Sequence, residues 1–114
     1  MMKKSNDNIL AQPLPLNLHL DTLAVRMSLP PSQFGENSEA LFLTSGYVQS
    51  SAESAARRFA GEEDGYTYGR TSNPTVTSFE MRLAAMEGTE ATIATSSGMA
   101  AIMLMMFSLL KSGD

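Results

Sequence analysis

The feature that most constrains the fold is the run Met99 to Leu110, M-A-A-I-M-L-M-M-F-S-L-L, in which only Ser108 is polar. The run begins after Gly98 and is followed by K-S-G, which is typical of the end of a helix. A helix that is apolar on every side has no solvated face and needs cover on most sides. We therefore interpret its methionines as core residues and not as a soft-metal site or an adaptable partner groove. These methionines are Met99, Met103, Met105 and Met106.

The segment before this helix has the chemistry of a phosphate cradle. Glu90 to Thr95, E-A-T-I-A-T, predicts a buried strand, and Ser96, Ser97 and Gly98 lie at the junction with the helix. The first N–H groups of a helix are unpaired, and the positive end of its dipole lies behind them. Such a junction binds anions, and glycine lets a ligand approach the backbone closely. For this junction by itself, an ordinary serine cap without a ligand is the alternative.

A second motif supplies matching charge. In Y-T-Y-G-R-T-S-N-P-T, Tyr66 to Thr75, Tyr68 and Arg70 are two residues apart, so in an extended segment both side chains leave the same face. A guanidinium offers a planar fork of donors to phosphate oxygens, and a phenol adds another donor. The alternative for this pair by itself is a packed tyrosine beside an ordinary surface arginine.

Together these motifs carry a family resemblance. The pattern Y-x-R-x-x-N-P-T, followed by helix, strand and S-S-G-M-A-A, resembles the pyridoxal-phosphate (PLP) enzymes of cysteine and methionine metabolism, the trans-sulfuration enzymes. The similarity extends back through L-T-S-G-Y-V-Q and E-S-A-A-R-R-F-A-G-E and covers roughly Asp21 to Asp114. Within the family, the sequence of this upstream segment is most similar to that of the O-succinylhomoserine sulfhydrylases.

The resemblance implies a role for four residues. Gly98 and Met99 match the positions whose backbone N–H groups hold the cofactor phosphate. Tyr68 and Arg70 match the positions that reach the cofactor phosphate of the neighbouring subunit. No catalytic residue is expected within this chain, because the family's Schiff-base lysine and its other reacting groups lie further along. Lys111 is interpreted as a cation at a helix C-terminus.

The resemblance also implies the fold and the activity. We expect the α/β fold of the PLP-dependent transferases (aspartate aminotransferase-like, fold type I), with residues 1–73 forming an N-terminal arm that contacts a partner subunit and residues 74–114 beginning the PLP-binding domain. One predicted strand has no ladder partner, so we expect the N-terminal part of a longer subunit. Without the Schiff-base lysine, this part is expected to be inactive by itself. The expected reaction converts O-succinylhomoserine and sulfide to homocysteine. Cystathionine synthesis, γ-elimination as in methionine γ-lyase, and a truncated non-catalytic chain are the alternatives.

Composition excludes other classes of protein. There is no cysteine, so neither a disulfide nor a Cys-ligated metal is expected, and a net charge of −4 without a large Lys/Arg cluster disfavours nucleic-acid binding. No signal-peptide core is evident, and twelve apolar residues fall short of the ~20 that span a bilayer. These observations favour a cytoplasmic enzyme. The resemblance further implies a homo-oligomer, expected to be a dimer of dimers, that acts on a small amino-acid substrate. The acidic turn Glu62 to Gly65 is interpreted as solvated, not as a metal loop.

Local signals predict three further helices. Asp21 is expected to cap a helix over Leu20–Met27, and Ser50 with Glu53 has capping-box spacing before a helix over Ala52–Ala60. Asn73-Pro74 opens the next helix, closed by Gly88, with one apolar stripe: Val76, Phe79, Leu83 and Met86. His19, the only histidine, has no nucleophile beside it, which disfavours a catalytic role.

Overall fold

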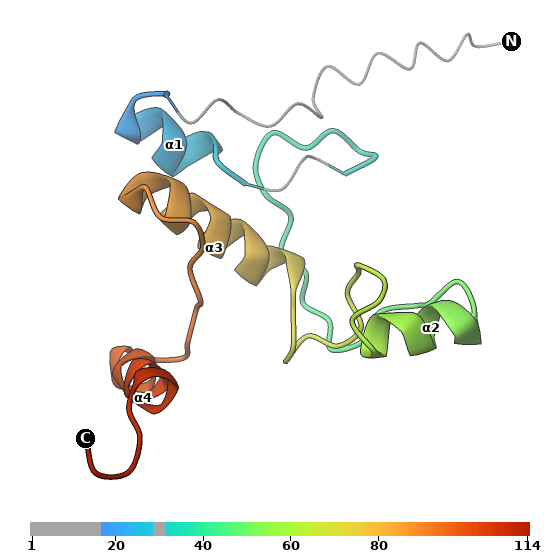
Figure 1. Cartoon of the computed structure of the whole chain (residues 1–114). Coiled ribbons are helices and arrows are strands. Elements are labelled where there is room, and N and C mark those ends of the chain that lie inside the picture. Colours follow the sequence, from blue (N-terminus) through green and yellow to red (C-terminus); the bar gives the residue numbers. More distant parts are fainter. Residues whose placement is uncertain (1–16, 29–31) are drawn as a thin grey trace, which may run out of the picture.

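A computed structural model describes residues 17–28 and 32–114 of the chain. Within these residues the secondary structure consists of four helices: α1 (Leu20–Arg26), α2 (Ala52–Phe59), α3 (Pro74–Glu87) and α4 (Gly98–Leu109) (Figure 1). The described residues form no strand, and one isolated antiparallel bridge joins Gly46 to Tyr68. Most of the expected N-terminal arm, residues 1–16, lies outside the described residues.

The ends of α3 are as predicted. Asn73 has an extended backbone, and its side-chain oxygen accepts from the Thr75 N–H at 2.8 Å, while Pro74 occupies the first turn, where no N–H is needed. Gly88 ends the helix in the left-handed region at φ 65°, which glycine adopts without a steric penalty. Local sequence therefore specifies both ends of this helix.

Two predicted caps are wrong by one or two residues. His19, not Asp21, is the N-cap of α1, and its Nδ1 accepts from the Asp21 N–H at 3.4 Å. Ser51, not Ser50, caps α2, and its hydroxyl accepts from the Ser54 N–H at 3.1 Å. Adjacent polar residues can each serve as a cap, so the register of the first turn decides between them.

The packed part of the described structure is the contact between α1 and α3, the pair of helices that lie against each other in Figure 1. Leu23, Met27 and Ala84 are its buried apolar residues, at 5%, 8% and 7% exposure. Arg82 of α3 donates its Nε–H to the Met27 carbonyl at 2.9 Å and forms an ion pair with Glu39. Packing and charge thus fasten α1 and the following loop to α3.

The apolar stripe predicted for α3 is not the face that packs. Val76 and Phe79 are 41% and 55% exposed, whereas Ser78 and Ala84 are buried. In a helix, positions 76, 79, 83 and 86 lie on a different face from positions 78 and 84. Helix α1 packs against α3, and of the predicted stripe Leu83 and Met86 are half-buried while Val76 and Phe79 stay exposed.

The predicted buried strand Glu90–Thr95 is also wrong for this structure. The segment is extended but belongs to no strand, and Ile93 is 71% exposed. A strand requires neighbours that satisfy its backbone groups, and no other described segment pairs with it. Its one tie to α3 is the Ala94 N–H, which donates to Glu80 Oε1 at 2.7 Å.

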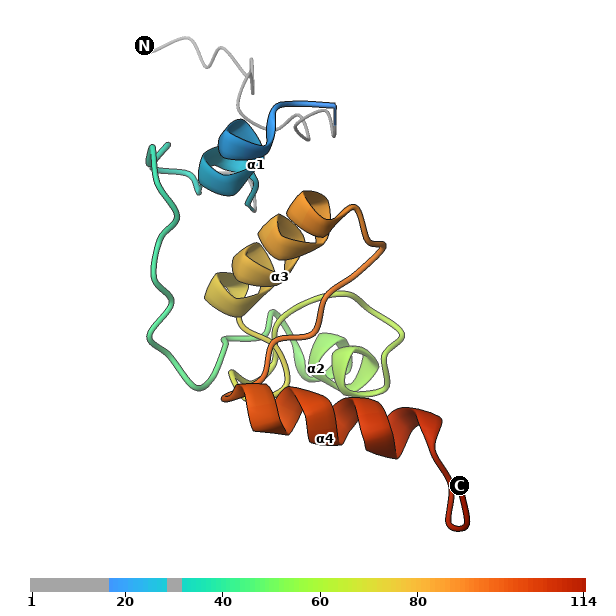
Figure 2. The ribbon, with the colours of Figure 1, turned by 90° about the vertical axis from the view of Figure 1, so that its left-hand side faces the viewer.

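Helix α4 forms as predicted but packs against no other described helix. None of its residues is buried, although Ser108 is the one polar residue between Met99 and Leu110. In Figure 2, α4 passes in front of α2, but Figure 1 shows the two helices far apart. The predicted core helix is therefore uncovered in the described residues.

Candidate functional site

The N-terminus of α4 has the donors that the sequence predicts. Ser97 is extended (φ −162°, ψ 158°), and its hydroxyl accepts from the Ala100 N–H at 3.2 Å. The N–H groups of Gly98 and Met99 have no acceptor among the described residues. Two unpaired donors therefore lie at the positive end of a twelve-residue helix.

The space around this terminus suits a phosphate. A Cβ built on Gly98 would have no heavy atom within 4 Å, so the approach to the backbone is open. Ser97 serves as the cap, and Ser96 is exposed beside it, so its hydroxyl is free to donate. Backbone N–H groups, serine hydroxyls and a helix dipole are the donor set of a phosphate site. The residues present fit the phosphate of PLP.

Tyr68 and Arg70 come together, but not as predicted. The segment is a turn and not an extended strand, because the Tyr68 carbonyl accepts from the N–H groups of Thr71 and Ser72 at 3.0 and 3.1 Å. The Arg70 guanidinium carbon lies 5.3 Å from the centre of the Tyr68 ring, a cation–π contact. Both side chains are exposed, and Arg70 forms no ion pair within the described residues. The guanidinium fork is available to an anion.

This turn is anchored to the segment 42–46. Tyr68 forms the isolated bridge with Gly46, and the Gly69 N–H donates to the Ser45 carbonyl at 2.7 Å. On the other side of the turn, the Asn73 amide donates to the Phe42 carbonyl at 2.9 Å. The sequence pattern predicts Asn73 as part of a motif and as a helix start, but it does not predict this second contact. The signal for it was the choice of Asn over Asp, because Asn has an NH2 donor beside its acceptor oxygen whereas an ionised Asp only accepts.

The two candidate elements do not converge within one chain. In Figure 1 the turn of residues 66–72 lies beside α2, whereas α4 lies on the other side of α3's lower end. Gly98 and Met99 therefore lie on one element and Tyr68 and Arg70 on another. Both pairs of residues can contact one phosphate only if they come from different copies of the chain or if the chain rearranges.

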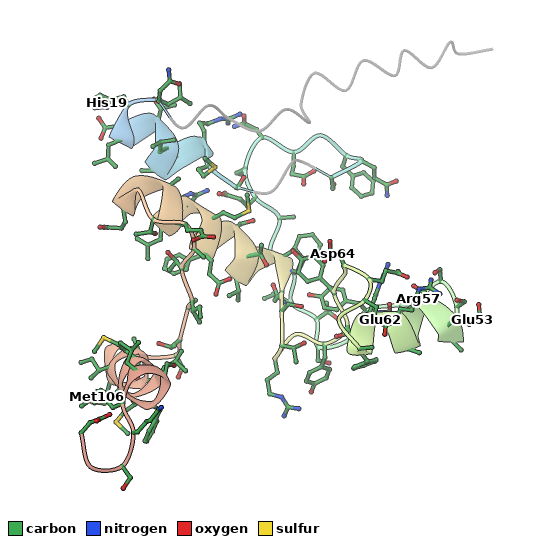
Figure 3. All side chains as sticks on the ribbon, in the orientation of Figure 1. His19, Glu53, Arg57, Glu62, Asp64 and Met106 are labelled. Carbon is green, nitrogen blue, oxygen red and sulfur yellow. The ribbon has the colours of Figure 1, made fainter. Side chains whose placement is uncertain are left out.

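The acidic turn after α2 is an ion-pair cluster. Glu63 accepts from the Ser54 hydroxyl at 2.6 Å, from Arg57 at 2.7 Å and from Arg58 at 2.9 Å. The Ser54 hydrogen bond, followed by that of Arg57, lowers the pKa of Glu63 below its ordinary value of 4.5. Figure 3 shows Arg57, Glu62 and Asp64 gathered around α2. No group of side chains suited to a metal ion occurs within the described ranges, and none of their helices could cross a membrane.

Comparison with known proteins gives consistent results. The model of the family described as Cys/Met metabolism PLP-dependent enzyme matches residues 21–114. The chain is 54% identical over 94 residues to an O-succinylhomoserine sulfhydrylase of Pseudomonas aeruginosa, covering 82% of this chain and 23% of that protein. It is 48% identical over 101 residues to the enzyme of the same name from Mycobacterium tuberculosis, covering 89% of this chain and 25% of that protein.

Relatives with another activity are also similar. An L-methionine gamma-lyase of Fusobacterium nucleatum is 43% identical over 95 residues, covering 83% of this chain and 24% of that protein. Among solved structures, metB from Corynebacterium glutamicum matches with a TM-score of 0.74 at 27% identity, covering 86% of this chain and 24% of that one. The chain thus spans about a quarter of the length of the relatives that it matches.

These matches confirm the predicted family, cofactor class and fold. The fold is that of the α/β PLP-dependent transferases of fold type I, and the described residues supply helices of it without its sheet. A match over 94 of 114 residues extends across both candidate elements, the Tyr68–Arg70 turn and the N-terminus of α4. The chain belongs to the PLP-dependent enzymes of cysteine and methionine metabolism.

Proposed function

We propose that the chain is the N-terminal part of a γ-replacement enzyme that converts O-succinylhomoserine and sulfide to homocysteine. The observation that carries this proposal is the 54% identity to an O-succinylhomoserine sulfhydrylase across most of the chain. The 43% identity to a methionine γ-lyase keeps γ-elimination as the second candidate.

In this proposal Gly98 and Met99 bind the cofactor phosphate through their backbone N–H groups. Both groups are unpaired in the described structure and lie where the helix dipole favours an anion. Because the donors are backbone atoms, the phosphate position is fixed by the helix itself. This is the part of the site that one chain supplies to its own cofactor.

Tyr68 and Arg70 supply the second part, to the cofactor of a neighbouring subunit. Their separation from α4 in Figure 1 supports a role in another subunit's site. Arg70 has no carboxylate partner among the described residues, so its charge is available to a phosphate dianion. The proposed assembly is a cytoplasmic homo-oligomer, with residues 1–73 at the subunit contact and residues 74–114 beginning the PLP-binding domain.

PLP supplies an electron sink that weakens bonds around the amino-acid substrate. In the overall reaction the Cγ–O bond to succinate breaks and a Cγ–S bond to hydrosulfide forms, giving homocysteine and succinate. The residues of this chain do not contribute the proton-transfer groups. Their part is to hold the cofactor in one orientation, and correct positioning of the reacting groups raises the rate.

The substrate assay uses the full-length protein with O-succinylhomoserine and sulfide, and separately with L-methionine. We expect homocysteine and succinate in the first reaction and little 2-oxobutyrate in the second. Predominant release of 2-oxobutyrate and methanethiol from methionine, without homocysteine synthesis, would favour the lyase. No reaction with either substrate by a protein that retains PLP would reject both.

The role of Arg70 is tested by Arg70→Ala in the full-length protein. Removing one partner of a buried, charged hydrogen-bonded pair costs ~2–5 kcal/mol, so PLP affinity should fall roughly thirtyfold to several thousandfold. Arg70→Lys should recover part of the loss, since it restores charge without the fork. Mixed oligomers of Arg70→Ala subunits and subunits without the cofactor-binding lysine should recover some activity. Mixed oligomers that form but stay inactive would reject action across the interface.

The 114-residue chain by itself is expected to be inactive. Incubation with PLP, borohydride reduction and peptide mapping should show no stoichiometric label at one lysine. Site-specific stoichiometric labelling together with turnover of O-succinylhomoserine would contradict this expectation.

A further inference from the structure

We propose that Asn73 and Gly69 are positioning residues that hold the Tyr68–Arg70 turn in the geometry that binds phosphate. The inference rests on the proposed phosphate role of that turn. The observation behind it is that both ends of the turn are fastened to one short segment of the chain, residues 42–46.

The far end of the turn is fastened by Asn73, which is 8% exposed. Its side-chain oxygen caps α3 by accepting from the Thr75 N–H at 2.8 Å, and its amide group donates to the Phe42 carbonyl at 2.9 Å. The Phe42 N–H in turn donates to Thr75 Oγ1 at 2.9 Å. The Asn and Thr of the N-P-T sequence therefore bind both backbone groups of Phe42 and tie it to the start of α3.

The near end is fastened by backbone contacts that require glycine. Tyr68 bridges to Gly46, and the Gly69 N–H donates to the Ser45 carbonyl at 2.7 Å. A Cβ at position 69 would lie 2.8 Å from the Thr44 carbonyl oxygen, a backbone atom that cannot swing away. A Cβ at position 46, in the same bridge, would meet no atom within 4 Å. The close approach is therefore specific to Gly69.

Inside these anchors the turn is closed by its own hydrogen bonds. The Tyr68 carbonyl accepts from the N–H groups of Thr71 and Ser72, and from Thr71 Oγ1 at 2.8 Å. The backbone of Tyr68 and Arg70 is thus set before any ligand binds, although both side chains are exposed. Preorganised donors bind more tightly because less ordering remains for the binding step.

The test uses the full-length protein and separates the anchor from the helix cap. Asn73→Ser keeps a good N-cap oxygen but loses the amide that reaches Phe42. Gly69→Ala keeps every side chain and pushes the turn away from Thr44. Gly46→Ala is the matched control, in the same bridge but in open space. The dissociation constant for PLP is measured by titrating apoprotein and following cofactor absorbance.

We expect Asn73→Ser and Gly69→Ala each to raise the dissociation constant for PLP by roughly 5- to 30-fold. A change of this size corresponds to the loss of about one hydrogen bond. Gly46→Ala should stay within about twofold of the parent, since surface changes away from such contacts are small. The melting temperature of each apoprotein is recorded beside the titration. Loss of affinity in equal measure for Gly46→Ala and Gly69→Ala would overturn the steric argument.

A double-mutant cycle decides whether the anchors act through the turn. If they do, Asn73→Ser and Gly69→Ala should add little once Arg70 is alanine, because the group they position is gone. Full additivity with Arg70→Ala would overturn the positioning role.

A large effect of Arg70→Ala with no effect of Asn73→Ser or Gly69→Ala would also overturn the positioning role, but the proposed function would stand. No effect of Arg70→Ala would reject the phosphate role of the turn and, with it, the positioning role. If Asn73→Ser fails to fold, the Gly69→Ala arm decides.

Discussion

The α1–α3 pair and α4 both consist of helices that begin at a side-chain N-cap, but only the α1–α3 pair is covered by another helix. Leu23 and Ala84 are 5% and 7% exposed where α1 meets α3, whereas no residue of α4 is buried and Phe107 is 77% exposed. Both α3 and α4 begin at a side-chain cap, with N–H to oxygen distances of 2.8 and 3.2 Å. Figure 3 shows Met106 among side chains of α4 that stand clear of the other helices.

The comparison shows that capping and hydrophobic content form a helix but do not bury it. Burial requires a complementary surface, and α1 with its C-cap residue supplies one to α3 through Leu23 and Met27. Helix α4 has the more apolar sequence and finds no such surface among the described residues. Substitutions in the 114-residue chain can test this contrast.

The largest effect is expected from α4. The free chain should self-associate and bind hydrophobic dyes, since burying each large apolar side chain is worth ~1.5–3 kcal/mol. The triple variant Ile102→Lys, Met106→Lys and Leu109→Lys should lose most of the dye fluorescence, and its sedimentation profile should shift toward monomer. A monomeric parent chain with a sharp, reversible melting transition, seen alike by near-UV and far-UV circular dichroism, would contradict the expectation.

A matched pair of leucines separates the covered region from the uncovered one. Leu23→Ala should clearly lower amide-exchange protection in α1 and α3, because a buried leucine leaves a cavity. Leu104→Ala, at 43% exposure in α4, should leave amide-exchange protection in α4 nearly unchanged. Equal losses from the two substitutions would mean that α4 is covered in solution.

Loss of an N-cap should speed up amide exchange most in the helix that has the fewest other stabilising contacts. Ser97→Ala and Ser51→Ala each remove an N-cap hydrogen bond worth ~1 kcal/mol. Exchange at residues 98–103 should speed up more than exchange at residues 52–57, because the Glu63 cluster also holds α2 whereas α4 packs against no other described helix. The reverse order would show that α4 has support outside the described contacts.

The smallest effect is the pH dependence of α2. The Ser54 and Arg57 hydrogen bonds depress the pKa of Glu63 below 4.5, so the stabilisation is present above pH 4.5 and is lost as the pH falls through the folded-state pKa. Amide protection in α2 should therefore decline below pH 4.5, while Glu63→Gln should start lower and vary less with pH. A decline of the same size in Glu63→Gln would assign the effect to another group.

Much of the candidate site could be predicted from the sequence because its contacts are local. The Ser97 cap joins residues three apart, and the unpaired N–H groups of Gly98 and Met99 follow from any helix that starts there. The conformation of the Tyr68–Arg70 turn could not be predicted in this way. Its anchors lie on residues 42–46, and the Asn73–Phe42 hydrogen bond spans 31 positions of the chain.

Sequence alone specifies the four helices, the unpaired N–H groups that follow the Ser97 cap, and the family, because each depends on hydrogen bonds within a helical turn or on the order of motifs. The tertiary structure alone decided which face of α3 is buried and that Glu90–Thr95 stays unpaired. The reason is that burial and strand pairing need partners distant in sequence. The Arg82–Met27 hydrogen bond that helps fix α1 on α3 joins residues 55 apart, and no periodicity in either helix specifies it.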